Sequence, residues 1–207
     1  MVSAKRFWDR AAPKYARQPV KDVASWDETL ARTRRHLAAT DEVLEVGCGT
    51  GSSALRLADA VGRLTATDIS GEMIAIARQK AAKAGVDNVT FRAGTLDDPA
   101  LPAGGYDAVL ALNLLHLVED VPRALGRIRE VLRPGGVFIS KSACLKGRGW
   151  YLRPLIGAMR AVGRAPRVAF FSATELDRMV SAAGFAIVEA EDIPPGAPTR
   201  FIVARKA

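Results

Sequence analysis

The residues whose types and spacing could do chemistry begin with a glycine-rich turn. Gly47, Gly49 and Gly51 form a G-x-G-x-G pattern directly after an apolar run and directly before a helical pattern. Glycine lets the backbone approach a ligand closely, and the N–H groups of a helix N-terminus favour an anionic group. Asp68 ends the next apolar run, where a carboxylate can accept hydrogen bonds from both hydroxyls of a ribose. The pattern predicts a nucleoside site; the alternative is a tight turn and a simple helix cap.

The elements that must position these groups follow from the hydrophobic pattern. From Glu42 onward short apolar runs alternate with helical patterns, which indicates βαβ units and a parallel sheet. Only the proline-rich segment 193–198 separates the last two runs, which permits an antiparallel hairpin but no parallel crossover. We expect an α/β fold with a doubly wound, seven-stranded sheet that is mostly parallel and has an antiparallel last strand. The expected strands are 42–46, 63–67, 89–92, 106–111, 137–140, 185–190 and 200–205, and the expected helices are 52–60, 71–84, 120–133 and 172–184.

Composition narrows the class of protein. A hydrophobic share of 49% over 207 residues predicts one domain with a buried core. Cys48 and Cys144 lie far apart, which excludes a disulfide framework or a CxxC site and favours a reducing compartment. The strongly apolar run 108–118 is shorter than the roughly 20 residues that span a bilayer. Residues 1–17 lack the apolar stretch of a signal peptide, so we expect a cytoplasmic protein.

The net charge of +8 is concentrated in two segments. Residues 1–40 carry 9 basic and 4 acidic side chains, and residues 141–170 carry 7 basic and no acidic ones. We expect these segments to meet a partner or a substrate; the alternative is a merely solvated surface.

Four motifs in order resemble the class I methyltransferases that use S-adenosylmethionine. They are Glu45-Val46-Gly47-Cys48-Gly49-Thr50-Gly51, Asp68-Ile69-Ser70 with Met73, Gly105-Tyr106-Asp107-Ala108-Val109 and Leu132-Arg133-Pro134-Gly135-Gly136. Ser52 stands where a dinucleotide-binding fingerprint would have glycine or alanine, which argues against a nicotinamide cofactor. The resemblance covers roughly residues 40–140 and implies a Rossmann-like sheet. It divides a single domain, 1–207, into an N-terminal helical cap (1–40), a cofactor-binding core (41–140) and a basic insertion over the acceptor side (146–171).

The resemblance also implies roles for individual residues toward S-adenosylmethionine. Gly47, Cys48 and Gly49 would line its methionine end, and Glu45 would support that loop or the ammonium group. Asp68 would hold the ribose, and the remaining contacts would come from Ile69 and Met73 on the adenine and from the backbone of Asn113 near the sulfonium. Many relatives supply an aspartate to the adenine amino group where this chain has Thr95, so Thr95, Asp97 or the backbone around Leu96 would make that contact.

Methyl transfer from a sulfonium is an in-line displacement, in which positioning alone can supply about 7–11 kcal/mol. A strong base is therefore optional. His116 follows the fourth expected strand, where ligands bind in open α/β sheets, and its imidazole could take a proton from the acceptor. The alternative is that His116 only packs or caps in its loop. We expect no metal site, because His36 and His116 are far apart and no carboxylate spacing suggests a divalent ion.

Two segments outside the core point to the acceptor and to closure of the site. In the insertion, apolar residues at 152, 155, 156, 159 and 162 form a helical stripe, with arginines mostly off it. This helix would lie on an anionic membrane or bind a lipid-like acceptor, or else would only cover the pocket. Residues 7–15 look like the opening segment of quinone-biosynthesis and phospholipid methyltransferases, in which a tyrosine lines the pocket. Tyr15 is therefore the first candidate for closing over the cofactor, and Trp8 is the second.

We therefore expect methyl transfer to a small, hydrophobic or amphiphilic acceptor such as a quinone-like molecule, a lipid or a secondary metabolite. The expected location is cytoplasmic, with possible peripheral contact with an anionic membrane. Nucleic acid is not expected as a partner, because no Asn/Asp-Pro-Pro-aromatic motif follows the fourth strand. The alternative function is a non-catalytic nucleotide-binding module, or an RNA-binding protein that uses the basic segments.

Overall fold

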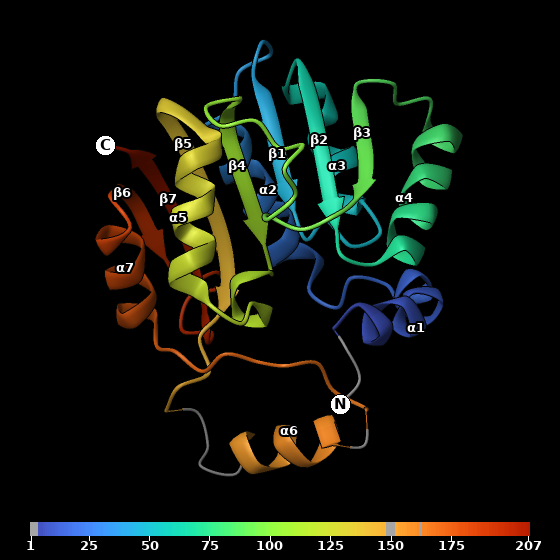
Figure 1. The fold of residues 1–207 in the computed structure, drawn as a ribbon, viewed down its shortest axis with the longest axis vertical. Coiled ribbons are helices and arrows are strands. Elements are labelled where there is room, and N and C mark those ends of the chain that lie inside the picture. The colour runs from blue at the N-terminus through green and yellow to red at the C-terminus, as the bar shows by residue number, and fades with distance from the viewer. Residues whose placement is uncertain (1–3, 148–151, 162) are drawn as a thin grey trace.

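A seven-stranded sheet forms the centre of the computed structural model, which describes residues 4–147, 152–161 and 163–207 (Figure 1). The strand order is β3-β2-β1-β4-β5-β7-β6. The first five strands along the chain pair in parallel, whereas β7 is antiparallel to both β5 and β6. This topology confirms the predicted sheet. The strands are β1 (Glu42–Val46), β2 (Arg63–Asp68), β3 (Val89–Ala93), β4 (Tyr106–Leu112), β5 (Leu132–Ala143), β6 (Phe185–Glu191) and β7 (Thr199–Lys206).

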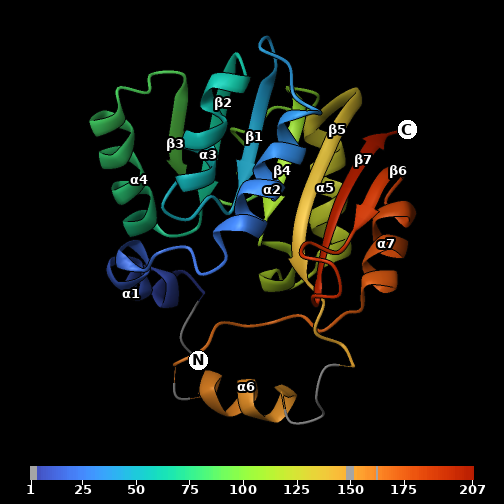
Figure 2. The ribbon, with the colours of Figure 1, turned by 180° about the vertical axis from the view of Figure 1, so that it is seen from behind.

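Helices cover both faces of the sheet (Figures 1 and 2). Those that pack on one face are α2 (Val23–Arg34), α3 (Ser52–Leu57) and α4 (Gly71–Ala84), and those on the other are α5 (Val121–Val131) and α7 (Ala173–Ala182). Two further helices, α1 (Ala4–Arg17) and α6 (Leu152–Ala161), lie beyond the carboxyl ends of the parallel strands. Short 3-10 turns follow α3 at Ala58–Ala60 (η1) and β4 at Leu115–Leu117 (η2).

Alternate side chains of the central strands fill two separate cores. Leu44 and Phe138 contribute to the core beneath α5 and α7, while their neighbours Val43 and Ile139 contribute to the core beneath α2, α3 and α4. All four side chains are fully buried. A strand buried on both faces reads as a continuous apolar run, which is why these strands were visible in the sequence.

Local capping signals fix the helix ends that face the site. Asp120 accepts a hydrogen bond from the Arg123 backbone N–H at the start of α5. Ser172 and Glu175 form the predicted capping box of α7. Asp107 accepts hydrogen bonds from the Glu42 backbone N–H and from Arg133, so that it joins the start of β1 to the start of β5.

Most predicted boundaries agree with the structure to within two residues, and two elements differ by three residues or more. The helix expected over 52–60 is α-helical only to Leu57 and then tightens into the 3-10 turn η1. The strand expected over 137–140 extends from Leu132 to Ala143, because Leu132 pairs with Tyr106 before an irregularity and the strand then continues along β7. Both differences depend on neighbours distant in sequence.

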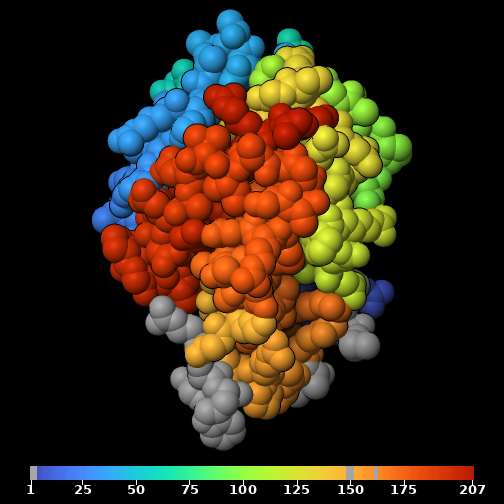
Figure 3. All heavy atoms as spheres, turned by 90° about the vertical axis from the view of Figure 1, so that its left-hand side faces the viewer, coloured from blue at the N-terminus to red at the C-terminus, as the bar shows by residue number. Residues whose placement is uncertain are grey.

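The insertion between β5 and α7 extends from one end of the molecule (Figure 3). Helix α6 lies there, and none of the side chains at residues 152–160 is buried. The predicted apolar stripe is exposed at Leu155 (50%) and Met159 (38%). Position 162 of that stripe lies outside the described residues.

Replacement of a core ring tests the packing between the sheet and its outer helices. Phe138→Ala should lower the free energy of unfolding by about 3–5 kcal/mol, because a fully buried ring leaves a cavity. Val188→Ala, at a side chain that is 58% exposed on β6, should change it by no more than about 0.5 kcal/mol. Urea unfolding of both variants measures the difference, and equal costs would contradict the described core.

Candidate functional site

The glycine turn between β1 and α3 has positive φ angles, which glycine adopts with little strain. Gly47 has a φ of 69°, and a Cβ added to it would lie 2.6 Å from Cδ1 of Leu114. Gly49 has a φ of 54°, and its open side faces Tyr15, whose Cε1 atom would lie 4.0 Å from an added Cβ. The ammonium of Lys80 braces the turn by donating to Thr50 and Ser52 at 2.8 and 3.1 Å.

Asp68 joins this turn to the end of β2. Its Oδ2 accepts the Gly49 backbone N–H at 2.9 Å, and its Oδ1 accepts the Ser70 backbone N–H at 2.8 Å. Partial burial raises the pKa of Asp68, although both N–H groups act in the opposite direction. Each carboxylate oxygen can accept a second hydrogen bond, so the group can still bind two ligand hydroxyls.

Helix α1, near the N-terminus, contacts the loop that follows β2. The Ser70 hydroxyl donates to Asp9 Oδ1 at 2.7 Å and accepts the Met73 backbone N–H at 3.1 Å, so one side chain both caps α4 and holds α1. Tyr15 is 51% exposed; partial burial, followed by the charge of Asp68, raises the pKa of its phenol. The predicted closing residue therefore lies beside the glycine turn.

Glu45 places a second carboxylate beneath the turn. Its side chain is only 2% exposed, and Oε2 has no hydrogen-bond partner among the described residues. Burial, followed by the charge of Asp68, raises the pKa of Glu45 to about 8. A buried acceptor without a donor is costly, and such a group in a concave site marks the place where a ligand donor fits.

The loop after β4 brings two more predicted residues to the carboxyl edge. Asn113 has a φ of 61°, uncommon for a residue other than glycine, and its N–H donates to the Lys141 carbonyl at 2.7 Å. His116 accepts the Ala143 backbone N–H at Nδ1 (3.3 Å), and its carbonyl accepts the Ala169 N–H at 2.7 Å. Burial lowers the pKa of His116 to about 4, so the ring is neutral and carries its proton on Nε2.

The other predicted cofactor residues lie in the glycine turn, at the start of α4 and in the loop after β3. Met73 is buried, Ile69 is half-buried, and the Cys48 thiol contacts the Gly49 carbonyl, with burial the main cause of its raised pKa. Thr95 is exposed and its hydroxyl accepts the Asp97 N–H, while the Leu96 carbonyl accepts from Arg127. The adenine contact therefore stays a prediction at these positions.

Sequence reasoning missed three polar residues that support the site. The hydrogen bond between Asp9 and Ser70 was not predicted. The sequence does indicate that Ser70, directly before α4, can cap that helix. Lys80, on the inner side of α4, carried no signal that would place it against the turn. Such contacts link elements far apart in sequence.

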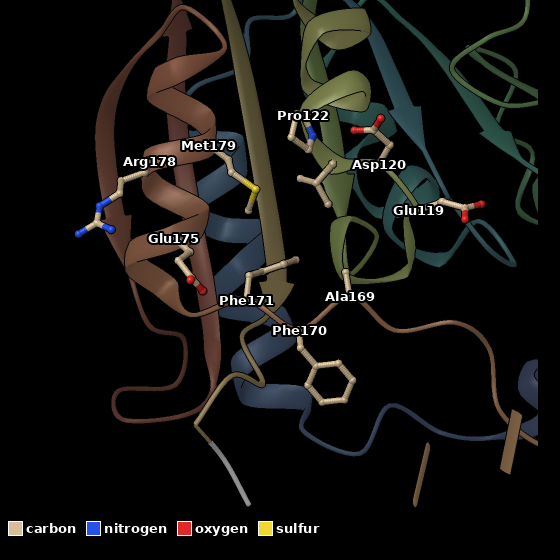
Figure 4. A pocket seen from close by; sticks show the side chains of 10 residues that line it. Glu119, Asp120, Pro122, Ala169, Phe170, Phe171, Glu175, Arg178 and Met179 are labelled. Atoms are coloured by element: carbon tan, nitrogen blue, oxygen red, sulfur yellow. The ribbon is translucent and has the colours of Figure 1, made fainter. Parts of the chain in front are cut away.

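An open pocket of about 710 Å³ lies between the N-terminal ends of α5 and α7 (Figure 4). Its apolar wall includes Pro122, Phe170, Phe171 and Met179, and acidic side chains stand at its rim. Because Ala169 also lines it, the pocket adjoins the backbone bond to His116. The end of the insertion thus forms an apolar surface beside the predicted catalytic loop.

Two features that would point to other functions are missing from the described residues. No group of three or more potential metal-ligating side chains was found among them. No helix in the described part of the chain is long and apolar enough to cross a membrane.

The glycine turn and Asp68 meet at the carboxyl edge of a sheet that has the topology of a Rossmann-like methyltransferase domain, and we call the candidate nucleoside site at this edge the crevice. Residues 43–136 match the family described as "Methyltransferase domain". A demethylmenaquinone methyltransferase of Symbiobacterium thermophilum is 33% identical over 150 residues, which are 67% of this chain and 58% of that one. The chain thus spans just over half the length of that relative.

Two further comparisons extend over more of the chain. A ubiquinone biosynthesis O-methyltransferase of Azorhizobium caulinodans is 29% identical over 198 residues, covering 89% of this chain and 77% of that one. The crystal structure of a SAM dependent methyltransferase from Aquifex aeolicus covers 100% of both chains with a TM-score of 0.73 and 17% identity, which shows a shared fold.

Removal of the hydroxyl that joins α1 to α4 tests the closure of the site. Ser70→Ala should cost about 1 kcal/mol of stability through the lost cap. It should also expose α1 to faster trypsin cleavage at Lys14 and Arg17, because the bond to Asp9 is lost. Limited proteolysis measures this, with Ser181→Ala on the exposed side of α7 as the control. Cleavage of α1 at the wild-type rate would contradict the described attachment.

Proposed function

We propose that this chain transfers a methyl group from S-adenosylmethionine to a small hydrophobic or amphiphilic acceptor. The observation that carries the proposal is the Asp68 carboxylate, held by Gly49 and Ser70 across the mouth of the glycine turn. The match of residues 43–136 to the methyltransferase-domain family and the names of the relatives, a demethylmenaquinone methyltransferase and a ubiquinone biosynthesis O-methyltransferase, support it. The division into an N-terminal cap, a cofactor core and an insertion is part of the same proposal.

The residues around the crevice fit such a cofactor. Asp68 would accept the ribose hydroxyls, and the positive-φ glycines at 47 and 49 would let the backbone reach the amino-acid end. The unpartnered Oε2 of Glu45 would face the ammonium group. When bound, the cofactor supplies an activated methyl group on a sulfonium, and the chain itself has to orient the acceptor and exclude water.

Positioning is the main catalytic contribution that the described residues can make. A neutral His116 with its proton on Nε2 is a hydrogen-bond donor to an acceptor oxygen; it becomes a base only if the Ala143 N–H releases Nδ1. Tyr15, from α1, would close the crevice over the glycine turn. Collinear alignment of the acceptor atom, the methyl carbon and the sulfur then provides the acceleration.

The acceptor class follows from the apolar surfaces near the catalytic loop. Phe170, Phe171 and Met179 line the pocket beside the His116 loop, and its size suits an apolar ring system or chain. The names of two relatives refer to demethylmenaquinone and to ubiquinone. Both are quinones, and an apolar surface suits such molecules.

Binding and transfer together test the proposal. Asp68→Ala should abolish or severely weaken binding of S-adenosylmethionine in calorimetry, because the ribose acceptor and the Gly49 and Ser70 contacts are lost together. Asp87→Ala, at an exposed aspartate in the turn between α4 and β3, is the matched control and should bind like the wild type.

Labelled S-adenosylmethionine mixed with fractionated lipids, quinones, metabolites and RNA identifies the acceptor. The proposal expects label in an apolar or amphiphilic small-molecule fraction. Intact binding with no transfer to any fraction would favour a non-catalytic nucleotide-binding module, and label or retention in RNA would favour a role for the basic segments. An Asp68→Ala variant that still binds S-adenosylmethionine and still transfers the label would contradict the proposed site.

We also propose that α6 contacts an anionic membrane surface. Leu155 and Met159 expose apolar side chains on a helix whose surrounding segment, 141–170, carries seven basic and no acidic residues. Apolar area together with basic charge is the composition that holds a helix at an anionic interface.

Vesicle sedimentation tests this contact. Wild-type protein should bind vesicles containing phosphatidylglycerol but not neutral ones, and salt should weaken the binding. Leu155→Glu with Met159→Glu should abolish it, whereas Val188→Glu, at an equally exposed apolar residue on β6, should not. Wild-type binding that is absent, or insensitive to salt and headgroup, would exclude the membrane role.

A further inference from the structure

Glu45 is the one ionisable side chain of the crevice whose chemistry the described contacts leave unexplained. It lies on β1, directly before the glycine turn, with 2% of its surface exposed. Its Oε2 is buried and has no hydrogen-bond partner among the described residues. If the carboxylate were ionised, Oε2 would lack both solvent and a donor, so the protonated form is favoured until a cation arrives.

The groups that face Glu45 reinforce this preference. Asp68, at the end of the neighbouring β2, adds a negative charge, and the Cys48 thiol of the turn is neutral because its pKa is raised. Beyond Asp68 lie Tyr15 and Asp9 of α1. Asp9 is paired with the ammonium of Lys5 at 2.8 Å, so that this pair has no net charge.

A half-buried lysine on α4 and a buried lysine on β5 donate to partners other than Glu45. Lys80 donates to Thr50 and Ser52, and Lys141 on β5 donates to Thr29 and to the Ser25 carbonyl of α2. Within the described part of the chain, no ion pair joins either ammonium to Glu45. The crevice therefore holds two carboxylates with no basic side chain to balance the deeper one.

We propose that Glu45 is protonated in the empty crevice and releases that proton to solvent when a ligand carrying an ammonium group binds. The inference rests on the proposed function, because it needs a nucleoside with an amino-acid tail in this crevice. The incoming ammonium supplies the donor that Oε2 lacks and the positive charge that offsets Asp68. One proton is released to solvent for each ligand bound, and Glu45 is left as a negatively charged carboxylate.

This exchange makes ligand affinity depend on pH in a defined direction. Below the pH at which Glu45 ionises in the empty protein, each further unit of acidity should weaken binding by up to about tenfold, because a proton has to be expelled. Above it, affinity should level off. A ligand without an ammonium group should bind with little dependence on pH in the same range.

Calorimetry in buffers of different ionisation enthalpy counts the released proton. S-Adenosylhomocysteine carries the amino-acid tail, and 5′-methylthioadenosine is the probe that lacks it. At pH 6–7 the wild type should release close to one proton with the first and close to none with the second. Glu45→Gln should release close to none with either, whereas Glu42→Gln, the same change at the start of β1, should behave like the wild type.

A ligand-free measurement keeps the test independent of binding. Because the folded-state pKa of Glu45 lies above its unfolded value, its contribution to stability is present at low pH and is lost as pH rises through about 8. The melting temperature of the wild type should therefore fall more steeply between pH 5 and 8 than that of Glu45→Gln. The raised pKa of Asp68 acts equally in both proteins, so the difference between the two slopes reports Glu45.

The outcomes separate this inference from the proposed function. If neither nucleoside binds to the wild type, the proposed function fails. If both bind but S-adenosylhomocysteine releases no proton, the inference about Glu45 fails while the function stands. Release that persists in Glu45→Gln would assign the proton to Asp68 and overturn the inference, as would equal pH slopes of melting for the wild type and Glu45→Gln.

Discussion

The hydrogen bonds of the Asp68 carboxylate are the interaction on which the rest of the site depends. One oxygen holds Gly49 of the turn and the other holds Ser70 at the start of α4, so two loops from adjacent parallel strands are fixed to one side chain. Through the Ser70 hydroxyl the same group reaches Asp9 of α1. The turn, the helix and the N-terminal cover therefore share one anionic anchor, which is also the predicted ligand contact.

The arrangement of the sheet explains why this anchor can exist. Because β1 and β2 are parallel and adjacent, their carboxyl ends deliver the glycine turn and Asp68 to the same edge. The β4 loop with Asn113 and His116 reaches that edge from the other side of β1. Ligand sites of open α/β sheets occur where neighbouring connections diverge in this way. The Asp68 carboxylate beside the buried Glu45 suits a ligand that carries a positive charge, whereas the segment 141–170 is rich in basic residues.

Much of this framework was readable in the sequence, and the remainder depends on contacts that a sequence does not encode locally. The strand 42–46, the helix 71–84 with its Gly85 cap, and the Ser172–Glu175 capping box were predicted as they occur, since each rests on hydrophobic period and on capping chemistry within a few residues. The proton position of His116, by contrast, depends on the Ala143 N–H of another strand. The missing partner of Glu45 and the exposure of the α6 stripe likewise depend on what the whole fold brings near them.

The central claim is that the Asp68 anchor and the glycine turn hold an adenosyl amino acid, and a crystal structure with S-adenosylhomocysteine tests it most directly. The account predicts ribose hydroxyls within hydrogen-bond distance of the Asp68 oxygens and the amino-acid tail against Gly47 and Gly49, with its ammonium beside Glu45. Ligand density at another place on the molecule, or a crevice in which protein side chains fill the space above the turn, would contradict it.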